Sequence, residues 1–156
     1  MKLTARDEAA LQGVHPDLAG VVRAAAARSF LTWFVNEGVR TPARQRMLLE
    51  AKRTLTLDSP HLARPTIVDG VSQKLGHAVD LVLRAGKGAD WAFDHYYALA
   101  AEVLEAAARR RVPMRWGGHF RSKSGARFAD GLHFELDADF YPRAKINFQN
   151  SLKETT

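Results

Sequence analysis

The stretch from Asp130 to Leu136 holds the residues whose types and spacing are best suited to chemistry. Because side chains alternate along a strand, Phe134 and Leu136 would share one face and His133 would lie on the other. Gly131 allows the chain to bend before this strand, so Asp130 can approach His133. A strand histidine with a carboxylate shortly before it suits a metal ligand beside a general base, although a purely structural histidine is the alternative.

Two further residues could complete a metal site. His61 follows Ser59 and Pro60 in a segment that we expect to be irregular. Asp80 lies within an otherwise apolar strand, where a carboxylate is costly unless it is paired or binds a cation. A salt bridge is therefore the alternative for Asp80. Two imidazoles and one carboxylate leave a fourth position for water, which is the arrangement of a catalytic zinc site.

The composition limits the kind of site and the kind of partner. The chain has 156 residues, of which 46% are hydrophobic, and this is the size of one domain. It has no cysteine, so disulfides and thiolate sites are excluded and a metal must be bound by His, Asp or Glu. The formal net charge of +6 indicates an anionic partner, such as nucleic acid, anionic lipid or a bacterial cell-wall polymer.

The sequence carries no apparent targeting segment. The charged N-terminal residues are not followed by a continuous apolar stretch, so they do not form a secretory signal. No apolar run is long enough to span a bilayer. We therefore expect the protein to be made in the host cytoplasm, without a signal peptide, and to act elsewhere only after release.

Periodicity and turn residues predict an α+β fold. We expect helices at residues 3–12, 16–29, 42–52 and 91–110, strands at 30–36, 77–83, 112–116 and 132–136, an irregular segment at 53–76 and an irregular tail or short terminal element at 137–156. Thr41 and Pro42 are suited to begin the third helix. Strands in separate pieces favour a small antiparallel sheet flanked by helices, in a single domain without a linker.

Four segments, in this order along the chain, resemble the zinc peptidases that cleave bacterial peptidoglycan stem peptides. That family includes D-Ala-D-Ala carboxypeptidases and dipeptidases and the phage L-alanyl-D-glutamate endopeptidases. The segments are residues 14–18, 37–45, 59–62 with 76–81, and 115–120 with 128–136. They span residues 13 to about 137, and the ordered set is far more specific than any one of them.

The resemblance implies a role for each matching residue. The family pattern has a Ser-x-His-x-x-Gly-x-Ala-x-Asp core and a later acid-x-x-His. Carried over, the metal ligands are His61, Asp80 and His133, and Asp130 is the catalytic acid and base. Arg40 matches the arginine that stabilises the oxyanion of the tetrahedral intermediate.

Three more residues are expected to contact the substrate. Gln45 and Ser59 match positions near the cleft, although capping or loop hydrogen bonds are the alternative for both. Trp116 could contact the substrate or pack beneath the site.

The chain departs from the family pattern between the first histidine and the aspartate. Six residues separate them in the family, whereas eighteen separate His61 and Asp80, because residues 63–75 are inserted. Since additional loop length costs little free energy, we expect an extruded loop that overhangs the cleft as a flap. His77 is the alternative ligand, but strand alternation should turn it away from Asp80.

Taken together, the resemblance implies a single zinc peptidase domain over residues 1–156 that acts as a phage-type endolysin. One zinc ion and the L-Ala–D-Glu bond are expected. A D-Ala-D-Ala carboxypeptidase and a non-catalytic wall-binding module are the alternatives. The partners would be peptidoglycan and, through the positive charge, the anionic cell envelope. Nucleic-acid binding is not expected because the basic residues are scattered, and we expect a monomer.

Overall fold

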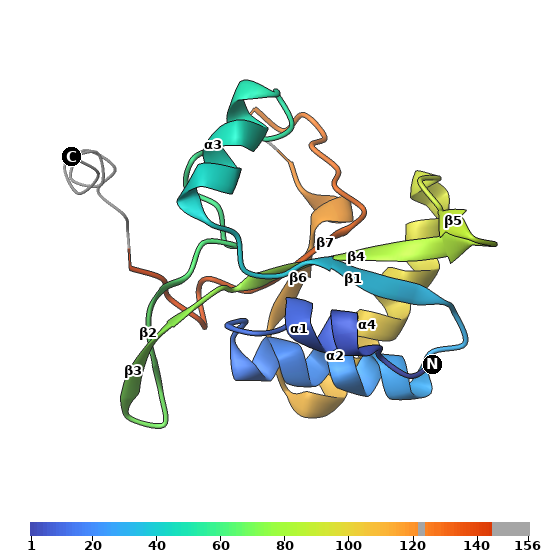
Figure 1. The fold of residues 1–156 in the computed structure, drawn as a ribbon, viewed down its shortest axis with the longest axis horizontal. Coiled ribbons are helices and arrows are strands. Elements are labelled where there is room, and N and C mark those ends of the chain that lie inside the picture. The colour runs from blue at the N-terminus through green and yellow to red at the C-terminus, as the bar shows by residue number, and fades with distance from the viewer. Residues whose placement is uncertain (122–123, 145–156) are drawn as a thin grey trace.

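The computed structural model describes residues 1–121 and 124–144, and it confirms an α+β fold with an antiparallel sheet. The main sheet has five strands in the order β1–β4–β7–β6, with β5 paired to β4 (Figure 1). These strands are β1 (Trp33–Glu37), β4 (Ala78–Ala85), β5 (Gly88–Ala89), β6 (Met114–Trp116) and β7 (His133–Leu136). A separate hairpin pairs β2 (Arg64–Val68) with β3 (Val71–Leu75).

Helices cover the main sheet unequally. The described part of the chain has four α-helices, which are α1 (Ala5–Ala10), α2 (Pro16–Arg28), α3 (Pro42–Glu50) and α4 (Tyr96–Arg110). Helices α1, α2 and α4 lie together on one side of the sheet, whereas α3 stands on the other side (Figure 1). None of the described helices is both long enough and apolar enough to cross a membrane.

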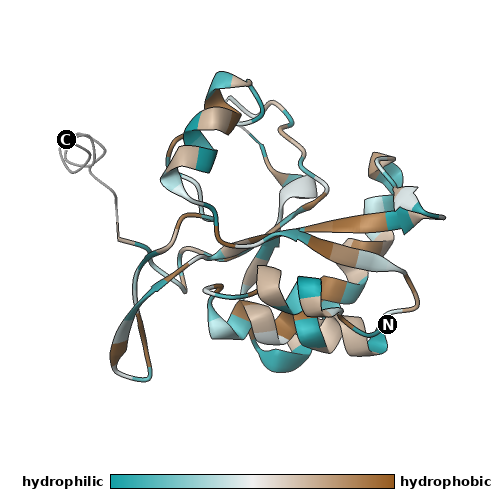
Figure 2. Ribbon diagram, viewed as in Figure 1, coloured by the Kyte–Doolittle hydropathy of each residue, from teal (hydrophilic) through white to brown (hydrophobic). Residues whose placement is uncertain are grey.

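The core lies between the sheet and helices α2 and α4. On β4, Val79, Leu81 and Leu83 face this core, as alternation predicts, and Asp80 faces the opposite side. Figure 2 shows the apolar residues running along β4 and β1. This face of the sheet is therefore packed against helices. We call the opposite face, which carries Asp80, the free face because no helix of the core packs on it, although Ala78 and Val82 on that side of β4 are also buried.

The strand register aligns three polar residues on the free face. Asp80 lies opposite His133 on β7 and opposite Glu37 on β1. The register of β1 shifts between Val35 and Glu37, which is a β-bulge. Without the bulge Glu37 would point to the same side as the fully buried Val35.

Two predicted elements begin later than expected. The first strand starts at Trp33, and Phe30 is 99% exposed. Helix α4 starts at Tyr96 because the Asp90 carboxylate accepts the Ala92 N–H at 2.9 Å, and this bond fixes a turn followed by a short 3₁₀ segment. The tail predicted from residue 137 has no helix or strand as far as residue 144, and residues 145–156 lie outside the described residues.

The prediction that residues 53–76 are irregular is wrong for their second half, which forms the β2–β3 hairpin. The turn residues Asp69 and Gly70 have φ values of 50° and 79°. Two successive positive φ angles define the turn type favoured in two-residue hairpins, and Asp-Gly is its typical sequence. The hairpin could therefore have been predicted from this dipeptide and the flanking Ile67, Val68 and Val71.

A buried carboxylate joins the N-terminal helix to the edge of the sheet. Asp7 is 2% exposed, accepts the Val35 N–H at 2.9 Å, and accepts the Thr4 N–H at 2.8 Å and the Thr4 hydroxyl at 2.6 Å. Burial alone would raise the pKa of Asp7, but these hydrogen bonds outweigh it and lower the pKa. The charged form is therefore the one that stabilises the fold.

We expect Asp7→Ala to lower the free energy of unfolding by about 2 kcal/mol, because the buried Val35 N–H and two donors of Thr4 lose their acceptor. Because the folded pKa of Asp7 lies below its unfolded value, its contribution is present at neutral pH and is lost as the pH falls below about 4. Urea denaturation at pH 7 and pH 3 measures both effects. Glu8→Ala is the control, since Glu8 forms an exposed ion pair with Arg23; an equal effect of the two variants would contradict the prediction.

Candidate active site

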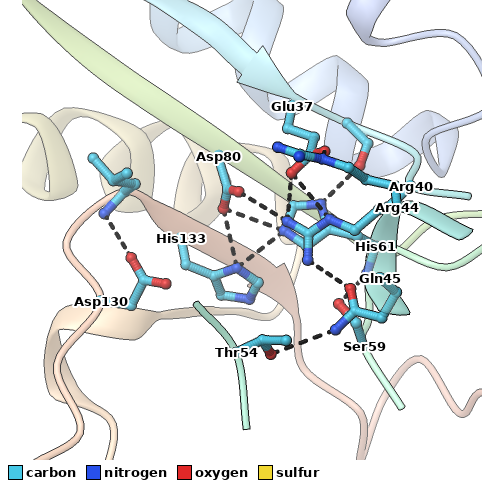
Figure 3. Close-up of polar contacts among 12 residues, drawn as sticks. Glu37, Arg40, Arg44, Gln45, Thr54, Ser59, His61, Asp80, Asp130 and His133 are labelled. Carbon is cyan, nitrogen blue, oxygen red and sulfur yellow. Dashed lines mark hydrogen bonds and ion pairs between the residues drawn. The ribbon is translucent and has the colours of Figure 1, made fainter. Parts of the chain in front are cut away.

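Three predicted ligands converge on the free face of the sheet. His61 Nε2, Asp80 Oδ1 and His133 Nδ1 form a triangle in which every edge is 3.2 Å (Figure 3). Asp80 and His133 come from paired strands, and His61 comes from the loop before the hairpin. The structure therefore brings together residues that are up to 72 positions apart in the chain.

Hydrogen bonds outside the triangle fix the orientation of both imidazole rings. His61 Nδ1 donates to the Gly38 carbonyl at 2.7 Å. His133 Nε2 donates to the Glu135 carboxylate at 3.0 Å. Each bond holds a proton on the outer ring nitrogen and leaves the inner nitrogen with a lone pair directed into the triangle, which is how metal-binding histidines are usually supported.

The triangle consists of three electron-pair donors, so it needs a positive charge at its centre. Burial would raise the pKa of Asp80, but the charges and hydrogen bonds of the two histidines lower it well below its ordinary range. Burial also disfavours a charged His133, yet its hydrogen bonds with Asp80 and Glu135 raise its pKa to about 9. A proton therefore serves as the cation at neutral pH when no metal ion is bound.

The geometry also fits a metal ion. Three ligands at about 2.0 Å from a tetrahedral ion would be about 3.3 Å apart, close to the edges of this triangle. Two imidazole nitrogens and one carboxylate oxygen form a donor set that zinc accepts. His61, Asp80 and His133 can therefore hold a divalent metal ion.

Asp130 lines the same cleft as the triangle. Its Oδ1 accepts the Leu132 N–H at 3.3 Å (Figure 3). Gly117 permits the close approach of this segment, since a Cβ at that position would lie 2.5 Å from the Asp130 carbonyl. Desolvation by the cleft walls, followed by the negative charge of Asp80, raises the pKa of Asp130. A carboxylate with a raised pKa can both accept and return a proton.

Arg40 is held in place by three side chains. Its Nε donates to Glu37 at 3.0 Å, its Nη1 to Gln45 at 2.8 Å, and its Nη2 both to Glu37 and, at 3.3 Å, to Asp80 Oδ2. Arg40 thus binds the carboxylate oxygen of Asp80 that lies outside the triangle. The salt bridge considered for Asp80 exists alongside the triangle with the two histidines and does not replace it.

The other predicted site residues lie in different places. Ser59 lines the cleft, and its hydroxyl accepts the His61 N–H at 3.3 Å. Gln45 is 1% exposed and Trp116 is 3% exposed, and neither lines the cleft. Gln45 joins Arg40 to the Thr56 carbonyl, and Trp116 donates to the Gly131 carbonyl beneath the site. Gln45 and Trp116 thus lie behind the cleft wall, as the supporting alternative considered for each would place them, and direct substrate contact by either stays a prediction.

The cleft has a volume of about 370 Å³, and its lining is both charged and aromatic. The wall formed by β1, α3 and the loop after α3 includes Arg44 and Arg53. Trp91 and Phe128 also line the cleft and are 67% and 49% exposed. The sequence did not predict that these two aromatic residues line the cleft, because nothing in the sequence distinguishes an aromatic residue of a cleft from one of the core. The position of Glu135 beside His133, by contrast, follows from alternation along β7.

The inserted segment does not overhang the cleft, so the flap prediction is wrong. None of residues 63–75 lines it. The base of the hairpin is held by hydrogen bonds from the His77 N–H to the Pro60 carbonyl and from the His15 N–H to the Gly76 carbonyl, both 2.8 Å. These bonds attach the hairpin beside the start of α2, and it projects away from α3 (Figure 1).

His77 belongs to this other region. Its Nε2 contacts the Thr66 hydroxyl at 3.0 Å, and its ring packs edge-on against His15. Burial, followed by the charge of His15, lowers the pKa of His77 to about 4. The prediction that His77 turns away from Asp80 is confirmed, because His77 lines a separate cavity with the hairpin.

Comparison with known proteins adds independent findings. The family described as phage L-alanyl-D-glutamate peptidase matches residues 1–137. Among solved structures, the L-Ala D-Glu endopeptidase ChiX of Serratia marcescens is 37% identical, with a TM-score of 0.73, over 91% of this chain and 94% of that chain. No curated protein matches the chain.

We expect the chain to bind one divalent ion and to release about one proton at pH 7, because the raised pKa of His133 means that metal displaces a proton. Apparent affinity should therefore increase as the pH rises from 6 towards 9. Calorimetric titration in buffers of different ionisation enthalpy measures both the metal affinity and the number of protons released. His133→Ala should lose binding and the exposed His95→Ala should keep it; equal affinities in the two variants would refute the assignment.

We also expect the hairpin to be dispensable for metal binding. Replacing residues 65–74 by two glycines retains the buried Arg64 and Leu75 and removes only the projecting part. Metal affinity measured by the same titration should stay within about twofold of the wild type, since loop shortening acts mainly on chain entropy. A shortened protein that keeps its circular dichroism spectrum but loses the metal would show that the insertion supports the site.

Proposed function

Because the chain belongs to the phage L-alanyl-D-glutamate peptidase family, we propose that it is a zinc-dependent endopeptidase that hydrolyses the L-Ala–D-Glu bond of peptidoglycan stem peptides. The observation that carries this proposal is the triangle of His61, Asp80 and His133 in a cleft that also holds Asp130. A metal site beside a carboxylate of raised pKa is the arrangement that hydrolysis of an unactivated amide requires.

In this proposal His61, Asp80 and His133 hold the zinc ion. When bound there, zinc supplies Lewis acidity, which lowers the pKa of water and polarises a carbonyl group. The hydrogen bonds from His61 to Gly38 and from His133 to Glu135 hold a proton on the outer ring nitrogens and aim the inner nitrogens at the ion.

Asp130 acts as the general base and then as the general acid. Its carboxylate takes a proton from the attacking water and passes that proton to the amine of D-Glu as the peptide bond breaks. Its Oδ1 is engaged by the Leu132 N–H, and that bond orients the carboxylate in the cleft. The raised pKa of Asp130 makes it a stronger base than an ordinary aspartate, so proton transfer from water is easier.

Arg40 stabilises negative charge that develops on the scissile carbonyl oxygen. Its four hydrogen bonds to Glu37, Gln45 and Asp80 use four of the five guanidinium N–H groups and leave one on Nη1. A donor whose position is fixed before the reaction contributes more than a mobile one, because it need not reorganise.

Under this proposal the protein acts as a phage-type endolysin. The protein would be made in the host cytoplasm and would reach the wall after release. Its formal charge of +6 would favour contact with the anionic envelope, an attraction that weakens with added salt.

Mass spectrometry of digested peptidoglycan tests the proposed reaction. We expect new fragments that begin at D-Glu, that disappear with a chelator and return with zinc. Release of D-Ala alone would move the activity to a carboxypeptidase on the same scaffold. No product under any condition would favour a non-catalytic wall-binding module.

We expect Asp130→Asn to bind zinc with unchanged affinity and to lower kcat by about 10² to 10⁴-fold, because an amide cannot accept the proton. Single-turnover digestion followed by chromatography measures the rate, and the titration described above measures the metal. The exposed Asp139→Asn is the matched control outside the cleft. Near-normal turnover by Asp130→Asn would remove the acid–base assignment.

A further inference from the structure

Arg53 lies in the wall of the cleft and differs from the other arginines there. Of the residues that the structure describes, three arginines line the cleft: Arg40, Arg44 and Arg53. Arg40 and Arg44 both form ion pairs with Glu37. Among residues 1–121 and 124–144, by contrast, the exposed Arg53 guanidinium has no hydrogen-bond or ion-pair partner. Its charge is therefore available to a ligand.

The backbone on both sides of Arg53 is fixed. Lys52 adopts a left-handed conformation with φ of 56° at the end of α3, and the Arg53 N–H donates to the Leu48 carbonyl at 2.8 Å. This is a helix C-cap that sets the direction in which the chain leaves the helix. On the other side, Gln45 donates to the Thr54 hydroxyl at 3.4 Å. The buried Gln45 thus links the position of Arg53 to that of Arg40.

The rest of the cleft directs an anionic group towards this wall. Asp80, Asp130 and Glu135 contribute carboxylates around the metal triangle, and Trp91 and Phe128 contribute apolar lining. A ligand carboxylate would be repelled by the carboxylates unless it binds the metal, and the aromatic residues offer it no charge. Arg53 provides a favourable partner away from the metal.

The proposed substrate carries such a carboxylate close to the scissile bond. Glutamate has two carboxyl groups, and the stem continues through only one of them, its side-chain carboxyl. The α-carboxylate therefore remains free on the residue that supplies the scissile nitrogen. In a cleft of about 370 Å³, near the small end for ligand sites, that carboxylate and Arg53 share one confined space.

We infer that Arg53 is a specificity-determining residue that binds the free α-carboxylate of D-Glu and makes the enzyme prefer stem peptides in which this group is not amidated. The inference rests on the proposed L-Ala–D-Glu cleavage. An arginine presents parallel N–H donors that match the two oxygens of a carboxylate, whereas an amide offers only one acceptor and no charge.

The test compares two N-acetylmuramoyl peptides that differ only at the D-Glu α-carboxyl, which is free in one and amidated in the other. For the wild type we expect kcat/KM to be about tenfold higher on the free form, as for a solvent-accessible charged hydrogen bond. Arg53→Gln should remove this preference, mainly by raising KM for the free form, and should leave the amidated form unchanged. Arg53→Lys should retain part of the preference, because it keeps the charge.

Arg46→Gln is the matched control, since Arg46 lies on α3, is exposed and does not line the cleft. This variant should have the wild-type kcat/KM on both peptides. The inference would be overturned if the wild type had equal kcat/KM on the two peptides, or if Arg53→Gln lowered kcat/KM equally on both. In either case L-Ala–D-Glu cleavage would remain established. Failure of the wild type to cut either peptide at this bond would overturn the proposed function and the inference with it.

Discussion

The site depends on the burial of one carboxylate, Asp80, in the middle of the sheet. A charged group at such a position is unfavourable unless positive charge surrounds it. His61 and His133 meet one carboxylate oxygen and Arg40 meets the other. Either a proton or a metal ion can complete this arrangement, so the same contacts that make Asp80 tolerable in the fold also create a group that can bind a metal ion.

The strand register sets which residues can meet Asp80. Pairing of β4 with β7 places His133 opposite it, and the bulge in β1 places Glu37 opposite it on the other side. Since one register step exchanges the two faces of a strand, the bulge is what puts Glu37 where it can hold Arg40. The packed face is unaffected, because Val35 pairs with Leu81 before the shift.

The insertion shows how an added segment can leave a site intact. Its ends are joined by the hydrogen bond between His77 and Pro60, so the additional residues form their own two-stranded unit. His61 and Asp80 therefore meet as if the intervening chain were short. The free-energy cost of a longer loop grows only slowly with length, and here it is offset in part by the hydrogen bonds of the hairpin itself.

The sequence by itself determined the features that depend on local rules. Alternation along β4 and β7 predicted which faces carry Asp80 and His133, and Thr41 caps α3 as its type and position predicted. The resemblance identified the family and the three residues that meet in the triangle. Only the tertiary structure decided the direction of the hairpin, the burial of Gln45 behind the cleft wall and the lack of a partner for Arg53 among the described residues. The reason is physical: these properties come from contacts between segments far apart in the chain, and neither residue type nor periodicity specifies which distant surfaces will meet.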